Sequence, residues 1–221
     1  MESNSSGYNP NIHHRRSIRL KGYDYSKAGM YFITICCQNR ICRFGKIVRT
    51  RNSNNSSGPE QMIIQSDIAT MKLNDAGKMV DEQWLAMVNR FPNIELHEYK
   101  IMPNHFHCIL EIVGVPLVGT QFNDAETTIG RPQGCAPTDP QNDGDKPKNK
   151  TIGDMMDAFK SIVTVEYIHG VKNKGWDRFN GKLLQRDYYE HIIRNEQEYL
   201  RISEYIVNNP SKWKEDKFYS E

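Results

Sequence analysis

The sequence predicts an α+β fold, a split βαβ arrangement in which an antiparallel sheet carries helices on one face. Two observations lead to this fold class. Short runs of β-branched and aromatic residues, typical of buried strands, alternate with longer segments whose apolar residues recur at helical spacing. In chain order, these segments give two strands, a helix, two strands, a helix, a short strand and C-terminal helices.

The first predicted elements are two strands and a helix. Residues 30–37 read Met-Tyr-Phe-Ile-Thr-Ile-Cys-Cys, a composition typical of a buried strand. Residues 41–48 form a second strand, which we expect to pair with the first across the polar turn between them. Residues 75–91 place apolar side chains at helical spacing and end before Pro92, which predicts a helix.

A hairpin and a long helix follow. Residues 94–101 and 105–113 form two strands joined by a tight turn, because Pro103 sets the backbone φ and Asn104 tolerates unusual backbone angles. The helix begins at Thr151, has Asp154 in a capping arrangement and ends at Gly170. The remaining predicted elements are a short strand and two C-terminal helices, at residues 182–185, 188–194 and 196–208.

The chain length is sufficient for one domain without disulfides or a structural metal. With 221 residues, of which 38% are hydrophobic, we expect a single domain over residues 1–221. Residues 1–15 are expected to form a flexible tail. Residues 49–60, rich in Ser and Asn, and residues 114–149, rich in Gly and Pro, are predicted to be mobile insertions.

Composition excludes several classes of protein. No apolar run approaches the ~20 residues of a membrane helix, and the N-terminus lacks the apolar stretch of a secretory signal, so we expect a cytoplasmic protein without membrane contact. Five cysteines without a CxxC pair predict reduced thiols. A net charge of +2 excludes binding to long duplexes by charge alone, so any nucleic-acid site must be local.

The most basic segment lies near the start and includes Arg16, Arg19 and Lys21. It is either a short basic arm without a partner or a segment that contacts phosphates. Charge alone favours the first interpretation.

The second strand of the hairpin begins with His105-Phe106-His107. Alternate residues of a strand point to the same face, so the two imidazoles start about 7 Å apart, within reach of one divalent ion. Neutral imidazole is the commonest metal ligand in proteins. The alternative is that two histidines simply occupy a half-exposed strand face, and an isolated His-x-His favours that alternative.

The C-terminal helix offers a nucleophile and a third ligand. Tyr199 falls on its apolar stripe and is expected to be a core aromatic residue, whereas Tyr205 and Asn209 lie one turn apart on its polar flank. The Asn209 side-chain oxygen could join the histidines on a metal. Without the histidines, Tyr205 would be read as an exposed tyrosine beside the end of a helix.

These residues suit phosphoryl chemistry on nucleic acid. A tyrosine hydroxyl has a pKa of about 10 and is a poor nucleophile at neutral pH, and an anionic phosphodiester repels attack. A metal held by two imidazoles and an amide oxygen leaves open positions for phosphate oxygens and neutralises developing charge. The mixed ligand set suits Mg²⁺ or Mn²⁺ and does not exclude zinc or cobalt.

Three segments occur in a specific order: Met-Pro-Asn-His-Phe-His-Cys-Ile-Leu, then Gln-Arg-Asp-Tyr-Tyr-Glu-His-Ile-Ile-Arg-Asn, then Tyr-Ile-Val-Asn-Asn-Pro. In this order they closely resemble the single-tyrosine HUH transposases, and most of all the REP-associated tyrosine transposases. The resemblance extends from about Arg16 to Trp213, apart from the two insertions.

This resemblance implies a ferredoxin-like domain whose C-terminal helices carry the nucleophile. It implies His105, His107 and Asn209 as metal ligands and Tyr205 as the residue that forms a 5′-phosphotyrosine. It also implies action on single-stranded DNA, often folded as a hairpin, without ATP. The basic segment falls where relatives contact DNA, and the long insertion after Val113 leaves both a monomer and a homodimer open.

The expected function is therefore a metal-dependent transposase or endonuclease that cleaves and rejoins single-stranded DNA. One alternative is a domesticated, non-catalytic protein that binds hairpin DNA or RNA. Another is a replication-initiator or relaxase-type nickase. Tyr188, Tyr189 and His191 are interpreted as DNA-facing or as support for the site, and His191 could ligate a metal or pair with a carboxylate.

Overall fold

A computed structural model describes residues 22–51, 67–114 and 150–220. The predicted tail at residues 1–15 and all but the first residues of the two predicted insertions lie outside this range. Of the insertion predicted at residues 49–60, residues 49–51 instead complete a strand.

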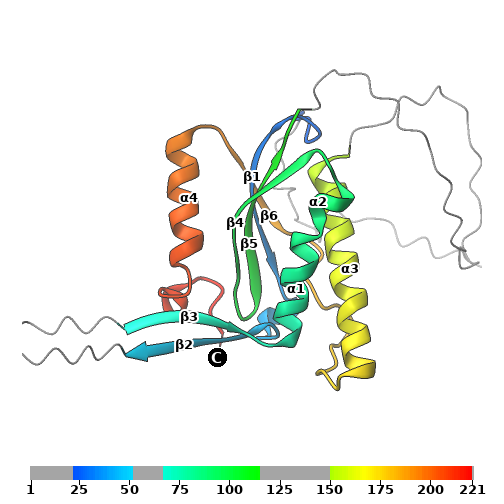
Figure 1. The fold of residues 1–221 in the computed structure, drawn as a ribbon, viewed down its shortest axis with the longest axis vertical. Helices are drawn as coiled ribbons and strands as arrows, with labels where there is room; N and C mark the ends of the chain where they lie inside the picture. Colours follow the sequence, from blue (N-terminus) through cyan, green and yellow to red (C-terminus); the bar gives the residue numbers. More distant parts are fainter. Residues whose placement is uncertain (1–21, 52–66, 115–149, 221) are drawn as a thin grey trace, which may run out of the picture.

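The centre of the fold is a four-stranded antiparallel sheet (Figure 1). Its strands are β1 (Gly29–Cys36), β4 (Ile94–Ile101), β5 (His105–Ile112) and β6 (Tyr189–Ile193), in the spatial order β4-β5-β1-β6. Helix α1 (Asp75–Leu85) connects β1 to β4, and α3 (Ile152–Asn173) comes between β5 and β6. Each connection therefore skips one strand of the sheet, which is the split βαβ topology. The predicted α+β class is confirmed.

The pairing predicted for the first two strands is wrong. Strand β1 pairs with β5 on one side and β6 on the other, so both of its edges are occupied. Residues 41–48 do not continue this sheet. Instead, β2 (Gly45–Arg51) pairs with β3 (Asp67–Leu73) in a separate two-stranded ribbon.

The helices between the strands cover one face of the sheet, as predicted, and the C-terminal helix covers the other face (Figure 1). On one face, α1 and α3 pack in the main core on alternate residues of β1 and β5, such as Ile33 and Phe106. On the other face lies α4 (Glu196–Asn208), whose Ile202 and Ile206 pack against Phe32 of β1. The strand face that carries His105 and His107 is therefore covered by α4 and the residues that follow it.

The segment before α4 was also predicted incorrectly. Instead of the helix predicted at residues 188–194, residues 189–193 form strand β6, and the short strand predicted at residues 182–185 is reduced to one bridge between Cys37 and Leu184. The edge of β1 that β5 leaves unpaired accepts this segment. Pairing there gives five residues the hydrogen-bond partners that an isolated helical turn would lack. Pairing with the distant strand β1 thus outweighs the local helix preference of this segment.

The helix boundaries show two smaller differences. The helix predicted at residues 75–91 is divided at Ala86 into α1 and the short α2 (Met87–Arg90). The capping pair predicted for α3 is confirmed, since Thr151 and Asp154 form a reciprocal capping box. Gly170 is not the stop, because α3 continues through it to Asn173.

Gly170 is instead required for close packing, and Gly170→Ala should destabilise the protein. A Cβ atom at this position would overlap the ring of Trp176, which folds back on the helix. Overpacking of this kind costs about 1–3 kcal/mol in the free energy of unfolding, more than the gain in helix propensity. Urea denaturation would measure it. Ser161→Ala, at an exposed position of the same helix, is the control, and equal stability of Gly170→Ala and wild type would contradict the packing argument.

Two predictions from composition, on the state of the cysteines and on membrane-spanning helices, can be compared with the structure. The four cysteines within the described residues, Cys36, Cys37, Cys42 and Cys108, are all free, as predicted for reduced thiols. In the same part of the chain, no helix combines the length and apolar character needed to cross a bilayer.

Candidate metal centre and tyrosine site

The two histidines lie at the start of β5, and their rings face the same side. Pairing with β1 places His105 opposite Cys36 and His107 opposite Thr34. The ring centroids are 4.4 Å apart, and both side chains are almost fully buried, with exposures of 0% and 1%. Phe106, between them, points into the main core, as the strand alternation predicts.

Neighbouring side chains set the orientation of both imidazoles. The Nδ1–H of His105 donates to the Oδ1 of Asn104 at 2.8 Å, because the Asn104 amide nitrogen already donates to the backbone oxygens of Arg40 and Phe218. The Nδ1 of His107 lies 2.8 Å from the hydroxyl oxygen of Thr34. In both rings Nδ1 is engaged, which leaves Nε2 to face the site.

The His105 Nε2 atom is buried and has no hydrogen-bond partner among the residues that the structure describes. Burial lowers the pKa of His105 to about 4 and holds the pKa of His107 well below its usual value, so both rings are neutral at physiological pH. A neutral, inward-facing nitrogen without a partner is the state that binds a metal ion. The donor set therefore fits a divalent cation.

Sequence reasoning missed a carboxylate that completes this group. One ligand atom each of His105, His107 and Asp216 lie within 4.8 Å of one another. Asp216 follows the short 3-10 helix η2 (Trp213–Glu215), which turns the chain back over the histidine face after α4. Nothing in the local sequence distinguishes Asp216 from its acidic neighbour Glu215, so only the path of the chain reveals it.

Asn209, the predicted third ligand, lies beside this cluster. It is 2% exposed, and its Nδ2–H donates to Asp216 Oδ2 at 2.9 Å. Its Oδ1 is buried without a hydrogen-bond partner in the described part of the chain. Two unpartnered acceptor atoms, on Asn209 and on His105, thus lie beside one carboxylate, an arrangement that a cation would satisfy.

Helix α4 brings Tyr205 to the same place. Its N-terminus is capped by Asn195, and Ile202 and Ile206 hold it against the sheet. The Tyr205 hydroxyl lies 3.4 Å from His107 Nε2, and its ring packs edge-on to Phe32. Tyr199, on the same helix, lies elsewhere, and its hydroxyl donates to Glu98 at 2.8 Å. The structure thus separates the two tyrosines as the sequence predicts.

The Tyr205 hydroxyl is protonated at neutral pH in this environment. Burial, and secondly the negative charge of Asp216, raise the pKa of Tyr205 to about 12. The ring nevertheless remains 38% exposed, so a substrate can reach it.

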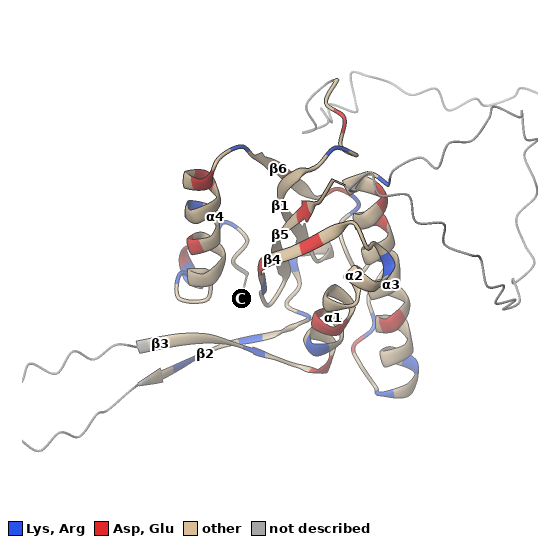
Figure 2. Ribbon diagram, turned by 45° about the horizontal axis from the view of Figure 1, so that its top comes forward, with Lys and Arg blue, Asp and Glu red and all other residues tan. Residues whose placement is uncertain are grey.

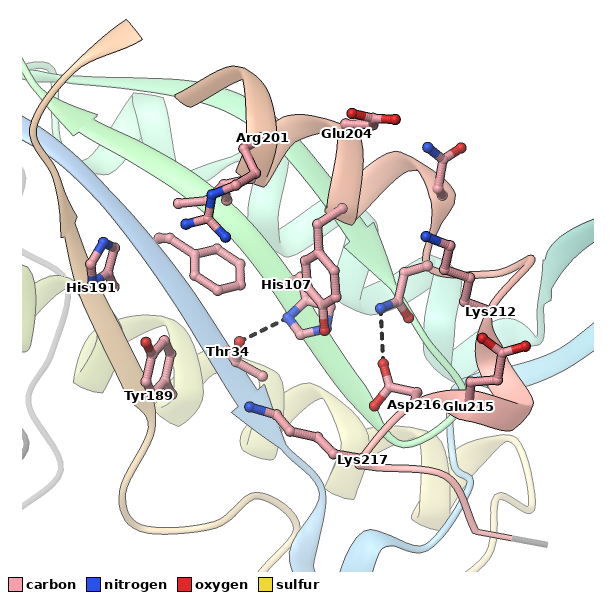
Figure 3. Close-up of a pocket in the computed structure, with 15 residues that line it drawn as sticks. Thr34, His107, Tyr189, His191, Arg201, Glu204, Lys212, Glu215, Asp216 and Lys217 are labelled. Atoms are coloured by element: carbon pink, nitrogen blue, oxygen red, sulfur yellow. Dashed lines mark hydrogen bonds between the residues drawn. The ribbon is translucent and has the colours of Figure 1, made fainter. Parts of the chain in front are cut away.

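A pocket of about 690 Å³ opens beside His107 and Tyr205. Figure 3 shows the side chains that surround it, with Lys217 reaching across towards Thr34 and Tyr189. Aromatic and cationic groups both line it, among them Phe32, Tyr189, Arg201 and Lys217.

Comparison with known proteins gives one close relative. The sequence matches no protein-family model. An uncharacterized protein of Haemophilus influenzae is 38% identical over 216 residues, which cover 96% of this chain and 97% of that protein. The chain belongs to the family of this Haemophilus protein.

Solved structures that resemble this chain include two that are named as transposases. One is a REP-associated tyrosine transposase bound to a REP hairpin, with 15% identity and a TM-score of 0.43, covering 88% of this chain and 74% of that one. The other is a transposase candidate from Deinococcus radiodurans R1, with 14% identity and a TM-score of 0.37, covering 87% and 97%.

The other residues that the sequence singles out lie in different places. His191 pairs with a carboxylate, since its Nε2 lies 2.7 Å from Glu198 Oε1, and it lines the pocket together with Tyr189. Tyr188 lies beneath the ammonium of Lys160 and packs against the main core. The predicted DNA-binding residues Arg16, Arg19 and Lys21 lie outside the described residues.

The orientation of His105 by Asn104 leads to a prediction. Asn104→Ala should weaken Mn²⁺ binding about 10–100-fold, because loss of the outer partner frees the ring to turn and its tautomer to change. Calorimetric titration with Mn²⁺ would measure the affinity, with Asn89→Ala at an exposed position as the control. An unchanged Mn²⁺ affinity in Asn104→Ala would show that the hydrogen bond does not set the ring.

Proposed function

We propose that this protein is a metal-dependent enzyme that cleaves and rejoins single-stranded DNA through a 5′-phosphotyrosine. The observation that carries the proposal is the approach of the Tyr205 hydroxyl to His107 Nε2, at 3.4 Å, beside the cluster of His105, His107 and Asp216. Those groups come from β5 and from α4 with the segment after η2, so two parts of the chain that are 98 positions apart at Tyr205 and His107 converge on one point.

The proposed cleavage step is an in-line attack by Tyr205. The Tyr205 oxygen forms a bond to phosphorus, and the bond from phosphorus to the 3′ oxygen breaks. The phenol proton passes to Asp216, whose carboxylate interacts with the hydroxyl, and the leaving 3′ oxygen takes a proton from water to become a free 3′-hydroxyl. Asp216 then releases its proton to the hydroxide that remains. The reverse attack by a 3′-hydroxyl reseals the strand and releases Tyr205.

His105, His107, Asp216 and Asn209 would hold the cation, which we propose to be Mg²⁺ or Mn²⁺. When bound, it would neutralise charge on the non-bridging phosphate oxygens and favour the tyrosinate over the phenol. The neutral imidazoles and the unpartnered oxygen of Asn209 support this ligand set.

The adjoining pocket supports an unpaired strand as the substrate. Tyr189 and Phe32 offer aromatic surfaces on which bases can stack, and Lys217 and Arg201 offer charge for the backbone. At about 690 Å³ the pocket has the volume of an ordinary small-ligand site, enough for a nucleotide next to the reacting phosphate. Hairpin-forming DNA is the proposed natural substrate, because a stem leaves such an unpaired flank.

The test is incubation of the protein with Mn²⁺ and a hairpin oligonucleotide that carries unpaired flanks and a label at its 5′ or its 3′ end. The proposal predicts two products on a denaturing gel: a covalent adduct that retains the 3′ label and a free fragment that carries the 5′ label and ends in a 3′-hydroxyl. Chelation of the metal should abolish both. Tight hairpin binding without any adduct would contradict the enzyme and favour a non-catalytic binding protein.

A further inference from the structure

The ribbon formed by β2 and β3 has one face that no other described residue of the protein covers. Its register pairs Lys46 with Lys72, Val48 with Thr70 and Thr50 with Ile68, so these six side chains share one face. All of them except Val48 are exposed. We call these six residues the open face.

The opposite face of the ribbon meets the body of the protein. Its members Met71 and Leu73 are partly buried and pack against the main core. The open face is turned to solvent, and the opposite face is anchored at Met71 and Leu73, whereas Arg49 on that opposite face is exposed. The anchored face gives the open face a defined position.

The described side chains of the ribbon carry charge of one sign only. Among its described side chains, at residues 46–50 and 68–73, Lys46, Arg49 and Lys72 are cationic and none is acidic (Figure 2). Lys46 and Lys72 stand directly opposite each other on the open face. Like charges in this position destabilise a pair of strands, and an anion bound across both would remove that cost.

We propose that the open face binds the phosphate backbone of duplex DNA, as the stem of the hairpin whose unpaired flank reaches Tyr205. The inference rests on the proposed function for its choice of DNA. The two lysines supply charge, and the hydroxyls of Thr50 and Thr70 supply hydrogen bonds to phosphate oxygens.

A duplex suits this surface better than a single strand. The ribbon spans seven residue pairs, or about 20 Å. Duplex DNA presents one charge per about 1.7 Å of its axis, twice the density of each strand alone. A two-stranded ribbon also matches the width of the major groove.

The position of the ribbon agrees with a stem beside the tyrosine site. In Figures 1 and 2 the ribbon runs below the C-terminal end of α4, the end that carries Tyr205 and Asn209. A stem on the ribbon would therefore have its unpaired flank on the same side of the sheet as the metal cluster.

The experiment measures binding of a DNA hairpin, and of its flank alone, by fluorescence anisotropy over a series of salt concentrations. The double variant Lys46→Gln/Lys72→Gln should bind the hairpin about tenfold more weakly, and its log–log salt dependence should be smaller by about two ions. Its affinity for the flank alone should be unchanged. The control Lys78→Gln/Lys172→Gln removes two exposed charges from α1 and α3 and should bind like wild type.

Equal hairpin binding by wild type and the ribbon variant would overturn the inference, as would an equal loss in the control. Displacement of the hairpin by polyglutamate as readily as by duplex DNA would also overturn it, since any acidic polymer would then suffice. Cleavage separates the two proposals. If an adduct forms on the flank but hairpin binding does not depend on Lys46 and Lys72, only the ribbon inference is overturned. If hairpin binding depends on the two lysines but no adduct forms, only the proposed enzymatic function is overturned.

Discussion

Tyr205→Phe is expected to abolish the covalent protein–DNA adduct and to reduce cleavage of single-stranded DNA at least about a thousandfold. The substitution removes only the oxygen that would bond to phosphorus. The ring keeps its edge contact with Phe32, and Ile202 and Ile206 still hold α4 on the sheet, so the fold should be preserved. The adduct is measured on a denaturing gel with labelled oligonucleotide and Mn²⁺.

Two other tyrosines provide matched controls. Tyr199→Phe removes a hydroxyl from the same helix, where it bonds to Glu98, and should leave adduct formation unchanged. Tyr189→Phe keeps the aromatic surface of the pocket and should also form the adduct. An adduct that survives Tyr205→Phe would assign the nucleophile to another residue and contradict the proposed step.

His105→Ala is expected to weaken Mn²⁺ binding at least about a hundredfold and to lose cleavage with it. The substitution removes the buried Nε2 atom that has no other partner in the described part of the protein. The proposed ligands that remain would then be Asp216, Asn209 and the imidazole of His107. Calorimetric titration measures the affinity, and the same preparations are assayed for cleavage.

This variant needs a separate test of folding. The His105 ring is fully buried and lies against Trp213 and Phe218, so its removal leaves a cavity. His105→Leu fills more of that space without offering a ligand atom, and His169→Ala removes an exposed histidine of α3 as the control. The thermal midpoint without metal reports the fold. If His105→Leu remains folded and binds Mn²⁺ like wild type, His105 is not a ligand.

Local signals in the sequence account for much of the architecture. The hairpin of β4 and β5 was predicted to within a residue, because its turn has a Pro-Asn signal and its strands have a clear alternation. The start of α3 follows from Thr151 and Asp154, which satisfy the first backbone donors whatever surrounds them. The helix over residues 196–208 has the same bounds in the structure.

The errors arise where pairing partners are distant in the chain. A helix is predicted at residues 188–194, yet residues 189–193 form a strand because the edge of β1, more than 150 positions earlier in the chain, accepts their hydrogen bonds. Residues 41–48 were predicted beside β1 because they come next in sequence, but β5 and β6 occupy both edges of that strand. The strands that compete for the edges of β1 are far apart in the sequence, so no short segment of it predicts which of them pair.

Local sequence patterns predict the α+β class, the shared face of His105 and His107, and the separation of Tyr205 from Tyr199 around α4. These features depend on strand alternation and helical periodicity, which act over a few residues. Local patterns do not predict that α4 covers the histidine face, that Tyr205 contacts His107 or that Asp216 lies beside them. Those contacts form between segments that are distant in the chain, because both faces of the sheet must be buried by packing against other elements.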